Sequence, residues 1–297
     1  MIRMITNKLI RWLTTVYDPL VPVRIGTQRI RAPLSHALRD ILQVYPQYGF
    51  NLTRLVAYTY SKYPELAIID IGANIGDTAA YINNFRDLAT LCIEGDPAYF
   101  GLLETNVRAF PATRCCLALV GASDQVMGKQ LIREKGTAHL QDTANQVPFR
   151  SLDTILEGYP EFNTGKFLKI DTDGYDISVL KGSSEFLIRQ QPVLFFEFDP
   201  GLIRQQLEDP VGIFGLLQSW GYEYMLVYQN NGDYLLSLHL SSAGDILFDL
   251  ANYYMGRETQ LYADVCLFSG RDRLLFEEAR EKELAWFSRF RKFHLNR

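Results

Sequence analysis

Short apolar runs alternate with longer amphipathic segments from about residue 65 to residue 220. The runs have the length and aliphatic composition of strands, and the segments between them repeat apolar residues with the period of a helix. The predicted strands are LAIIDIG, TLCIEG, RCCLALVGA, KFLKID and PVLFFEF, and the predicted helices cover 76–86, 97–109, 175–190 and 211–220. Several runs are apolar throughout, which indicates burial on both faces of a sheet. The alternation therefore predicts a doubly wound, mostly parallel α/β sheet.

Further strand patterns near the C-terminus predict an antiparallel edge on this sheet. YEYMLVYQ and YLLSLHL are separated by NNGD, which is typical of a hairpin turn, and YADVCLFSG follows later. Helical periodicity covers AGDILFDLANYYMG and residues 272–293. The aromatic-rich run 248–262 and the terminal helices are candidate surfaces for a homo-oligomer contact.

Residues 1–64 differ from the rest of the chain, because prolines interrupt them and no strand pattern stands out. We expect an N-terminal helical extension over 1–64 and one α/β domain over 65–297. The first residues of the chain repeat apolar positions at helical spacing, with Arg and Lys between them. That pattern predicts a helix packed on the domain, and contact with a membrane surface or a partner protein is the alternative.

A polar, glycine-containing segment interrupts the alternation over residues 123–165. It predicts a hairpin or a long loop, and insertions of this kind commonly lie at the functional rim of α/β folds. We therefore expect it to help form the pocket for the substrate.

The overall composition disfavours several classes of function. The formal net charge is -4 and the sequence pI is about 5.7, so the chain as a whole does not attract a nucleic acid. The cysteines form no C-x-x-C pair, which fits a reducing, cytoplasmic setting. No apolar run reaches the roughly 20 residues that a transmembrane helix needs, and the N-terminus does not resemble a secretory signal. We expect a cytoplasmic protein whose partner is a small molecule or a glycan.

The stretch IIDIGANIGDT passes from a buried strand through two glycines into a helix. In open α/β sheets ligands bind at the carboxyl ends of the strands, so this first turn is where a nucleotide-like cofactor is expected. Gly72 and Gly76 let the backbone approach a ligand, while Asp70 and Asn74 supply a carboxylate and an amide. The turn lacks one glycine of the dinucleotide fingerprint, and its acid repels a pyrophosphate. A cofactor with an ammonium and a sulfonium, such as S-adenosylmethionine, suits that charge better.

The ends of the next two strands supply the rest of the predicted cofactor site. Glu94 ends the second strand, where an acid accepts the hydroxyls of a ribose in nucleotide-binding folds. Gly121, Ala122 and Ser123 end the third strand and are predicted to wall an adenine slot. The predicted cofactor-binding residues are Asp70, Gly72, Ala73, Asn74, Gly76, Thr78, Glu94, Gly95, Ala122, Ser123 and Asp171.

Four segments in this order resemble the FkbM-type methyltransferases: DIGANIG, IEGDP, KFLKIDTDGYDISVLKGS and PVLFFEFDP. The resemblance covers about residues 65–200 and implies a class I methyltransferase (Rossmann-like) fold. It implies S-adenosylmethionine-dependent methylation of hydroxyls on sugars, polyketides and related metabolites, with Glu94 binding the ribose of the cofactor. It also implies that the methionine part is held by Asp70, Gly72, Asn74 and Gly76. The chain departs from the family's commoner KIDVEGAE segment, since Asp173 stands where Glu is usual.

The fourth predicted strand brings charged residues to the same edge of the sheet. Lys169 and Asp171 share one face of it, because side chains alternate along a strand. Methyl transfer to a hydroxyl needs the reactants held in line and a proton removed. Asp171 is the first candidate for contacting the cofactor or orienting the acceptor, and Asp173 is the second. A divalent ion shared by these two acids is an alternative, and helix capping is another for Asp173 and the favoured one for Asp176.

Two further residues complete the predicted catalytic set. His139 lies in the polar insertion, where it either accepts the hydroxyl proton or is an ordinary loop histidine. Glu197 lies among phenylalanines on the fifth strand, where an unpaired acid would be costly. It is therefore expected to face the substrate or to form a buried ion pair with a residue such as Lys169. The other histidines are interpreted as structural, and they are His36, His239 and His294.

The predicted activity is transfer of a methyl group from S-adenosylmethionine to a hydroxyl of a sugar, a glycan or a small metabolite. An NAD-linked oxidoreductase is the second enzyme hypothesis, and the missing glycine counts against it. The third hypothesis is a weakly active or inactive cofactor-binding module in a biosynthetic complex. The intact set of Asp70, Gly72, Gly76 and Glu94 counts against that loss of activity.

Overall fold

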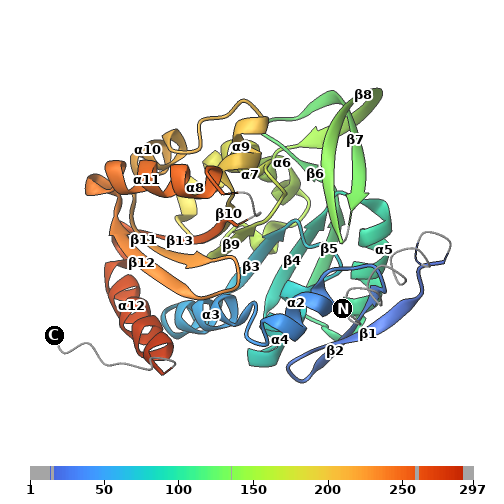
Figure 1. Ribbon diagram of the computed structural model, residues 1–297, viewed down its shortest axis with the longest axis horizontal. Coiled ribbons are helices and arrows are strands. Elements are labelled where there is room, and N and C mark those ends of the chain that lie inside the picture. The colour runs from blue at the N-terminus through green and yellow to red at the C-terminus, as the bar shows by residue number, and fades with distance from the viewer. Residues whose placement is uncertain (1–13, 15–16, 135, 258–260, 290–297) are drawn as a thin grey trace.

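The computed structural model describes residues 14, 17–134, 136–257 and 261–289. Its centre is an eight-stranded sheet of order β12-β11-β13-β10-β9-β3-β4-β5 (Figure 1). The strands are β3 (Ala67–Ile71), β4 (Ala89–Glu94), β5 (Thr113–Leu117), β9 (Phe167–Ile170), β10 (Val193–Phe198), β11 (Tyr222–Gln229), β12 (Tyr234–His239) and β13 (Ala263–Ser269). Strands β5, β4, β3, β9 and β10 run parallel, and the other three pair antiparallel. The predicted mostly parallel sheet with an antiparallel edge is confirmed.

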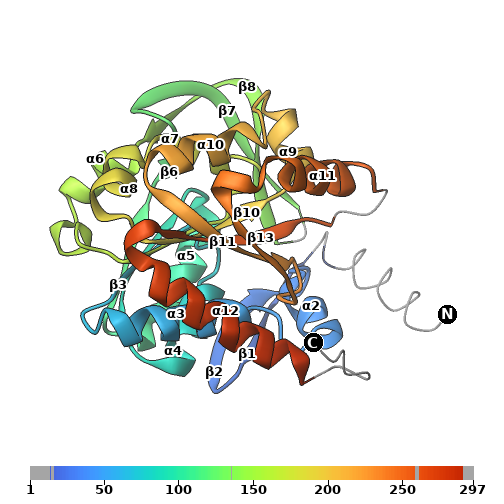
Figure 2. The ribbon, with the colours of Figure 1, turned by 90° about the vertical axis from the view of Figure 1, so that its left-hand side faces the viewer.

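Helices cover both faces of the sheet, so the molecule has three layers (Figures 1 and 2). One face carries α6 (Leu152–Glu157), α7 (Asp176–Lys181), α8 (Ser184–Gln190), α9 (Pro200–Gln205), α10 (Gly212–Ser219) and α11 (Gly244–Met255). The other carries α2 (Leu38–Val44), α3 (Phe50–Lys62), α4 (Asp77–Phe85), α5 (Pro97–Asn106) and α12 (Arg273–Ser288). Short 3-10 helices cover Val107–Ala109, Pro160–Phe162, Leu240–Ser242 and Gly270–Asp272. The central strands are mostly apolar because each face of the sheet is buried under helices, in separate hydrophobic clusters.

The predicted helix over 175–190 is interrupted and forms α7 and α8. Gly182 lies at the break, and a Cβ there would be 1.9 Å from the carbonyl oxygen of Gly121. Only glycine allows this close approach of the two backbones. At this break the connection between α7 and α8 packs against Gly121, the residue that follows β6 (Leu119–Val120).

The expectation of a wholly helical extension over 1–64 is wrong for residues 20–33. These residues form an antiparallel hairpin of β1 (Leu20–Ile25) and β2 (Gln28–Pro33). Buried and exposed side chains alternate along both strands, so one face of the hairpin packs against α4 and α5. The buried side chains join the hydrophobic cluster that also contains Ala73 and Ile75 of the glycine turn. The division into an extension and a domain stays a prediction, and the helix expected over the first residues falls almost entirely outside the described residues.

Asparagine side chains tie this hairpin to the main domain. Asn106 on α5 accepts the backbone N–H of Arg31 and donates to the carbonyl oxygens of Arg31 and Ile75. Asn84 on α4 accepts the N–H of Thr27 and donates to the carbonyl oxygen of Ile25. Because Ile75 belongs to the glycine turn, the hairpin and the turn are fixed to the same helix.

The polar segment over 123–165 contains the predicted hairpin. Strands β7 (Gln125–Glu134) and β8 (Thr137–Arg150) pair antiparallel and join β6 (Leu119–Val120) in a three-stranded sheet. Figure 1 shows this hairpin standing beside the carboxyl ends of the parallel strands. Helix α6 follows it and was not predicted from the sequence.

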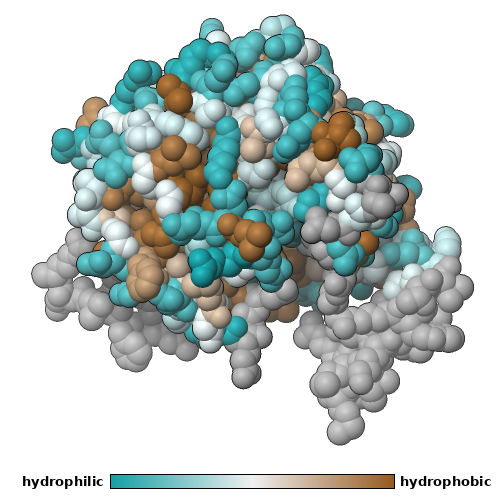
Figure 3. All heavy atoms as spheres, turned by 90° about the horizontal axis from the view of Figure 1, so that it is seen from above, coloured by the Kyte–Doolittle hydropathy of each residue, from teal (hydrophilic) through white to brown (hydrophobic). Residues whose placement is uncertain are grey.

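Seen from above in Figure 3, hydrophobic residues form separate groups among hydrophilic ones on this face of the molecule. Within the described part of the chain, no helix combines the length and apolar character required to cross a bilayer. The four cysteines are free thiols, and Cys92, Cys116 and Cys266 are buried in strands, where a thiol behaves as a small apolar side chain.

Candidate functional site

The glycine turn between β3 and α4 adopts a backbone conformation that its residues permit. Gly72, Asn74 and Gly76 have φ angles of 80°, 49° and 87°, in the left-handed region. A Cβ at Gly72 would lie 1.8 Å from the carbonyl oxygen of Asp171, so the turn passes directly over the end of β9. Asn74 donates from its side chain to the carbonyl oxygen of Gly136, between β7 and β8. The turn therefore contacts both the sheet edge and the hairpin.

Glu94 connects the end of β4 to this turn. One carboxylate oxygen accepts the backbone N–H of Asn74 at 2.7 Å, and the other accepts the N–H of Asp96 at 2.7 Å. The side chain is buried, and burial raises the pKa of Glu94 to about 7, although these backbone N–H groups act in the opposite direction. Each oxygen keeps a second lone pair for a ligand hydroxyl.

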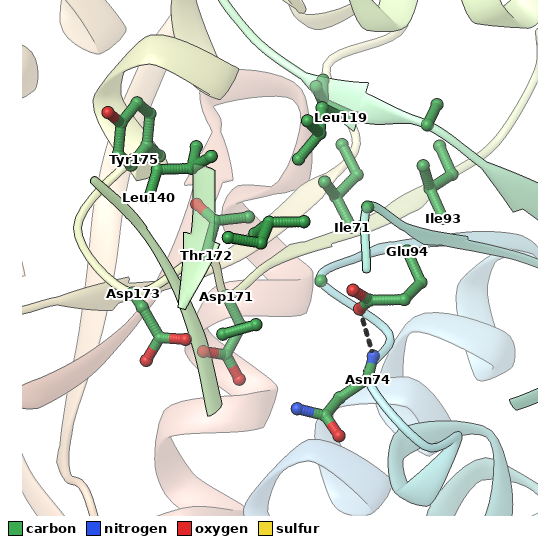
Figure 4. A pocket seen from close by; sticks show the side chains of 16 residues that line it. Ile71, Asn74, Ile93, Glu94, Leu119, Leu140, Asp171, Thr172, Asp173 and Tyr175 are labelled. Atoms are coloured by element: carbon green, nitrogen blue, oxygen red, sulfur yellow. Dashed lines mark hydrogen bonds between the residues drawn. The ribbon is translucent and has the colours of Figure 1, made fainter. Parts of the chain in front are cut away.

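A cavity of about 580 Å³, part of it open to solvent, lies between these residues and the end of β9. We call it the main cavity. In Figure 4, Glu94 and Asn74 line one side of it, and Asp171 and Asp173 line the other. Apolar side chains line the rest, and they are Ile71, Ile93, Leu119, Leu131, Leu140 and Tyr175, with Ala118, Val120 and Ala138. One cavity thus combines an apolar slot with carboxylates on facing walls.

Two residues that line the main cavity carry hydroxyl groups without a hydrogen-bond partner among the described residues. They are Thr172 and Tyr175, and both hydroxyl oxygen atoms are buried. Unsatisfied buried polar groups are uncommon in folded proteins and commonly mark a place where a ligand or water binds. A nucleoside with an adjoining amino acid tail fits this lining, because it presents an apolar base, a diol and an ammonium.

Lys169 on β9 lies between two carboxylates on the same face of the sheet. Its Nζ is 3.1 Å from Asp70 Oδ1 and 3.2 Å from Asp171 Oδ2. Burial by itself lowers the pKa of Lys169, but the charges of Asp171 and Asp70 outweigh it and hold this pKa well above its usual value. The lysine is therefore a fixed positive charge beneath Asp171, at the carboxyl end of β9.

Asp171 also shares a side-chain hydrogen bond with Glu197 on β10. Burial raises the pKa of Asp171, but the charge of Lys169 and the hydrogen bond with Glu197 together lower it. For Glu197, burial and the charge of Asp171 raise the pKa well above its usual value. These opposite shifts favour the proton of the pair on Glu197 and the negative charge on Asp171. The Asp171 side chain is 46% exposed, whereas Glu197 is 5% exposed.

Asp173 and Asp176 have different positions in the turn after β9. Asp173 lines the main cavity, and its carboxylate accepts the backbone N–H of Ala138 on β8. Burial, and then the charges of Asp171 and Glu94, raise the pKa of Asp173 to about 7. Asp176 is buried and accepts the N–H groups of Thr172 and Gly174, which precede α7. The predicted capping role of Asp176 and Asp173 is wrong, because Tyr175 occupies the N-cap position and no side chain caps this helix.

An adjoining cavity of about 700 Å³, also open in part, continues from the main cavity over the end of the sheet. Thr78 and Glu197 line it, together with Gly72, Asn74 and Asp171. His36, interpreted from the sequence as structural, lines it too, and its Nε2 lies 3.3 Å from Asn74 Oδ1. No sequence signal distinguished His36, because its proximity to the turn depends on how the N-terminal segment folds back.

Several predicted cofactor residues lie elsewhere than expected. Asp70 does not line the main or adjoining cavity; it is fully buried and pairs with Lys169. Ala73 packs in the core, so only its backbone helps shape the turn. Ala122 and Ser123 line a separate surface depression beside α6, whereas Leu119 on β6 lines the main cavity. Gly95 does line the main cavity.

His139 lies on β8, where its backbone pairs with Ile132, and its side chain is outside the described part of the structure. Its role as a proton acceptor stays a prediction. Among the described residues, no group of three or more His, Cys, Asp or Glu side chains is arranged to hold a metal ion.

Sequence reasoning missed the apolar wall of the main cavity. Leu119 follows the third parallel strand directly, and Leu131 and Leu140 face it from the hairpin. Tyr175 stands in the acidic turn that the sequence did single out. The position of Leu119 in the apolar run RCCLALVGA, near the carboxyl end of the third predicted strand, was the available signal.

Comparisons with known proteins place this geometry in a family. The domain family described as the methyltransferase FkbM domain matches residues 70–224. No curated protein matches the chain. A solved methyltransferase FkbM from Methylobacillus flagellatus KT is similar at 14% identity and a TM-score of 0.45, covering 68% of this chain and 43% of that one. The chain thus spans less than half the length of that protein.

Two other solved structures show weaker similarity of the same kind. A precorrin-6y C5,15-methyltransferase from Geobacter metallireducens GS-15 has 12% identity and a TM-score of 0.38, covering 69% of this chain and 80% of its own. A SAM-dependent methyltransferase from Geobacter sulfurreducens, solved with S-adenosyl-L-homocysteine, has 10% identity and a TM-score of 0.36, covering 72% and 90%. Because the FkbM methyltransferase domain matches residues 70–224, which is more than half of the sequence, this chain belongs to the FkbM methyltransferase family.

Proposed function

We propose that this protein is an S-adenosylmethionine-dependent O-methyltransferase that acts on a hydroxyl group of a sugar, a glycan or a small hydroxylated metabolite. The observation that carries the proposal is the pair of facing walls in the main cavity. Glu94 stands on one wall and Asp171 with Asp173 on the other, with an apolar slot beside them. A cofactor that is apolar at one end and positively charged at the other matches that distribution.

The residues that would hold the cofactor follow from this lining. Glu94 would accept the ribose hydroxyls, the apolar residues around Leu119 would enclose the base, and Asn74 and Asp173 lie where the amino acid tail would reach. When bound, S-adenosylmethionine supplies a methyl carbon activated by the sulfonium. Asp70 acts indirectly, because it holds Lys169 in place beneath Asp171.

Asp171 is the residue that we propose as the proton acceptor for the acceptor hydroxyl. Its pKa is lowered and its side chain is half-exposed at the cavity edge. Lys169 on β9, the strand that Asp171 follows, and Glu197 on the neighbouring β10 fix its position. A carboxylate that is both ordered and accessible can orient a hydroxyl and take its proton. The raised pKa of Glu197 and the lowered pKa of Asp171 favour Glu197 as the donor and Asp171 as the acceptor in their shared hydrogen bond.

Titration calorimetry with S-adenosylmethionine, S-adenosylhomocysteine and NAD tests the cofactor. Binding of the two adenosyl ligands without NAD is expected. Binding of NAD alone would favour the oxidoreductase, and failure of all three to bind would favour a module that has lost its cofactor. Incubation with methyl-labelled S-adenosylmethionine and a panel of hydroxylated metabolites then separates an active enzyme from a module that binds cofactor without turnover.

A further inference from the structure

A third cavity opens beside the adjoining one, between the sheet and helices α3 and α4. It has a volume of about 480 Å³, part of it open to solvent, and it shares Lys169 and Asp171 with the adjoining cavity. The remaining polar lining comes from elements far apart in the sequence. Asn51 lies on α3, Asp77 and Tyr81 lie on α4, and Asp264 lies on β13. We call it the inner cavity.

Two buried polar groups of the inner cavity have no partner among the described residues. They are the Tyr81 hydroxyl and Asn51 Nδ2, on side chains that are each 2% exposed. Leaving such groups unsatisfied costs about 1 to 3 kcal/mol each. Gly49 at the rim has a φ of 76°, and a Cβ there would lie 2.6 Å from the Tyr81 ring. The backbone at Gly49 therefore packs directly against the end of the ring that carries the hydroxyl. The wall thus contains polar groups that can form hydrogen bonds only with a ligand or with water.

Carboxyl groups outnumber cations in the lining of the inner cavity. Asp77, Asp171 and Asp264 line it, and Lys169 is the one cation among its described lining residues. Lys169 is already bonded to Asp171 and to Asp70, which stands behind it. Asp264 forms no ion pair with any described residue and lies opposite Glu197 in the β10–β13 pairing. A cation entering here would find carboxyl groups to pair with, whereas a phosphate or carboxylate would find Lys169 already paired.

We propose that the inner cavity binds the methyl acceptor, and that the acceptor is a small polyhydroxylated molecule carrying an ammonium group that pairs with Asp264. The inference rests on the proposed function, because it assigns the acceptor of that same site. The Tyr81 hydroxyl and Asn51 Nδ2 bind hydroxyls of the acceptor, and another hydroxyl reaches Asp171 at the border with the adjoining cavity. Burial and the charge of Asp171 raise the pKa of Asp264 to about 8, and a neighbouring ammonium stabilises its ionised form.

The test uses matched ligands on one carbon skeleton: D-glucamine, D-sorbitol and D-gluconate, with serinol, glycerol and glycerate as a smaller set. Binding is measured at pH 8 by saturation-transfer NMR with the full chain, both free and loaded with S-adenosylhomocysteine. We expect at least one amine to bind at least about tenfold more tightly than its neutral counterpart, and the acids not to bind. In Asp264→Asn this preference disappears, whereas S-adenosylhomocysteine binding is unchanged. Asp249→Asn, on the exposed face of α11, is the matched control.

Tyr81→Phe supplies a second measurement. It removes an unpartnered buried hydroxyl, so thermal stability stays the same or rises, while binding of the amines weakens about three- to tenfold. A purely structural role of Tyr81 would leave ligand binding unchanged. Equal binding of amine and polyol, failure of every amine to bind, or a preference that survives in Asp264→Asn would overturn the inference. Failure of S-adenosylhomocysteine to bind would instead overturn the proposed function, since the amine preference is also measured on the free protein.

Discussion

The carboxylate of Glu94 accepts the backbone N–H of Asn74 at 2.7 Å and so fixes the glycine turn against the end of the neighbouring strand. The same carboxylate faces the main cavity, so one residue both shapes the turn and is available to a ligand. A ligand that binds Glu94 therefore also stabilises the turn. This coupling makes Glu94 the most informative position for testing the cofactor site.

We expect Glu94→Gln to weaken binding of S-adenosylhomocysteine by about 10- to 100-fold. A hydrogen bond to a charged group contributes about 1.5 to 3 kcal/mol, and the amide keeps the size of the side chain but not its charge. Calorimetry measures the dissociation constant, with Glu104→Gln on the exposed face of α5 as the control. An unchanged dissociation constant in Glu94→Gln would remove this residue from the cofactor site.

Cofactor binding is expected to depend on pH near neutrality. The pKa of Glu94 is raised to about 7, so its carboxylate becomes protonated as the pH falls through 7. A ligand that requires the ionised form then loses affinity, by up to about tenfold per pH unit. The dissociation constant of S-adenosylhomocysteine measured from pH 5.5 to pH 8 should rise toward the acid side. That slope should be smaller in Glu94→Gln, and equal slopes in both proteins would contradict the assignment.

Asp171→Asn should reduce methyl transfer far more than it reduces stability. A positioned proton acceptor contributes about 100- to 10,000-fold to a rate, and the amide cannot take the proton. Asp171 is half-exposed, and Lys169 keeps its bond to Asp70, so the fold keeps its buried ion pair. Turnover with labelled cofactor and an accepted substrate is compared with the melting temperature. Asp245→Asn on α11 is the control, and normal turnover in Asp171→Asn would exclude this role.

Because Glu197 ionises less readily in the folded protein than in the unfolded chain, it should cause the free energy of unfolding to fall as the pH rises. Its pKa in the folded state lies well above that of an unfolded glutamate. Its contribution is therefore fully present below about pH 4.5 and is lost as the pH rises toward the folded-state pKa. Glu197→Gln keeps a donor to Asp171 and removes this titration. The wild-type melting temperature should fall more than that of Glu197→Gln between pH 5 and pH 9; parallel curves would show that Glu197 is ionised when folded.

Asn106→Ala should loosen the N-terminal hairpin and the glycine turn together. It removes three hydrogen bonds, two to Arg31 and one to Ile75, from a buried side chain. We expect a loss of about 2 to 3 kcal/mol in the free energy of unfolding, measured by urea denaturation. Thr105→Ala, which removes an exposed bond within the same helix, should cost much less. Similar losses in both variants would show that the hydrogen bonds of Asn106 to Arg31 and Ile75 contribute little to stability.

The order of strands and helices could be predicted from the sequence because apolar periodicity is a local property. The glycine turn and Glu94 could be located for the same reason, since parallel strands bring their carboxyl ends to one edge. The N-terminal hairpin was missed because its alternation is short and interrupted by prolines. Its burial depends on Asn84 and Asn106 from two later helices.

By itself the sequence determined the doubly wound sheet, the turn over its first strand and the pair of residues on one face of β9, because each follows from spacing along the chain. The tertiary structure alone decided that Asp70 lies beneath Lys169, that Leu119 and Tyr175 close the main cavity, and that Asp264 lies beside Glu197. The last of these arises because β13, the final strand, inserts between β10 and β11. Contacts between residues so distant in sequence are set by how the layers pack, and no local pattern encodes them.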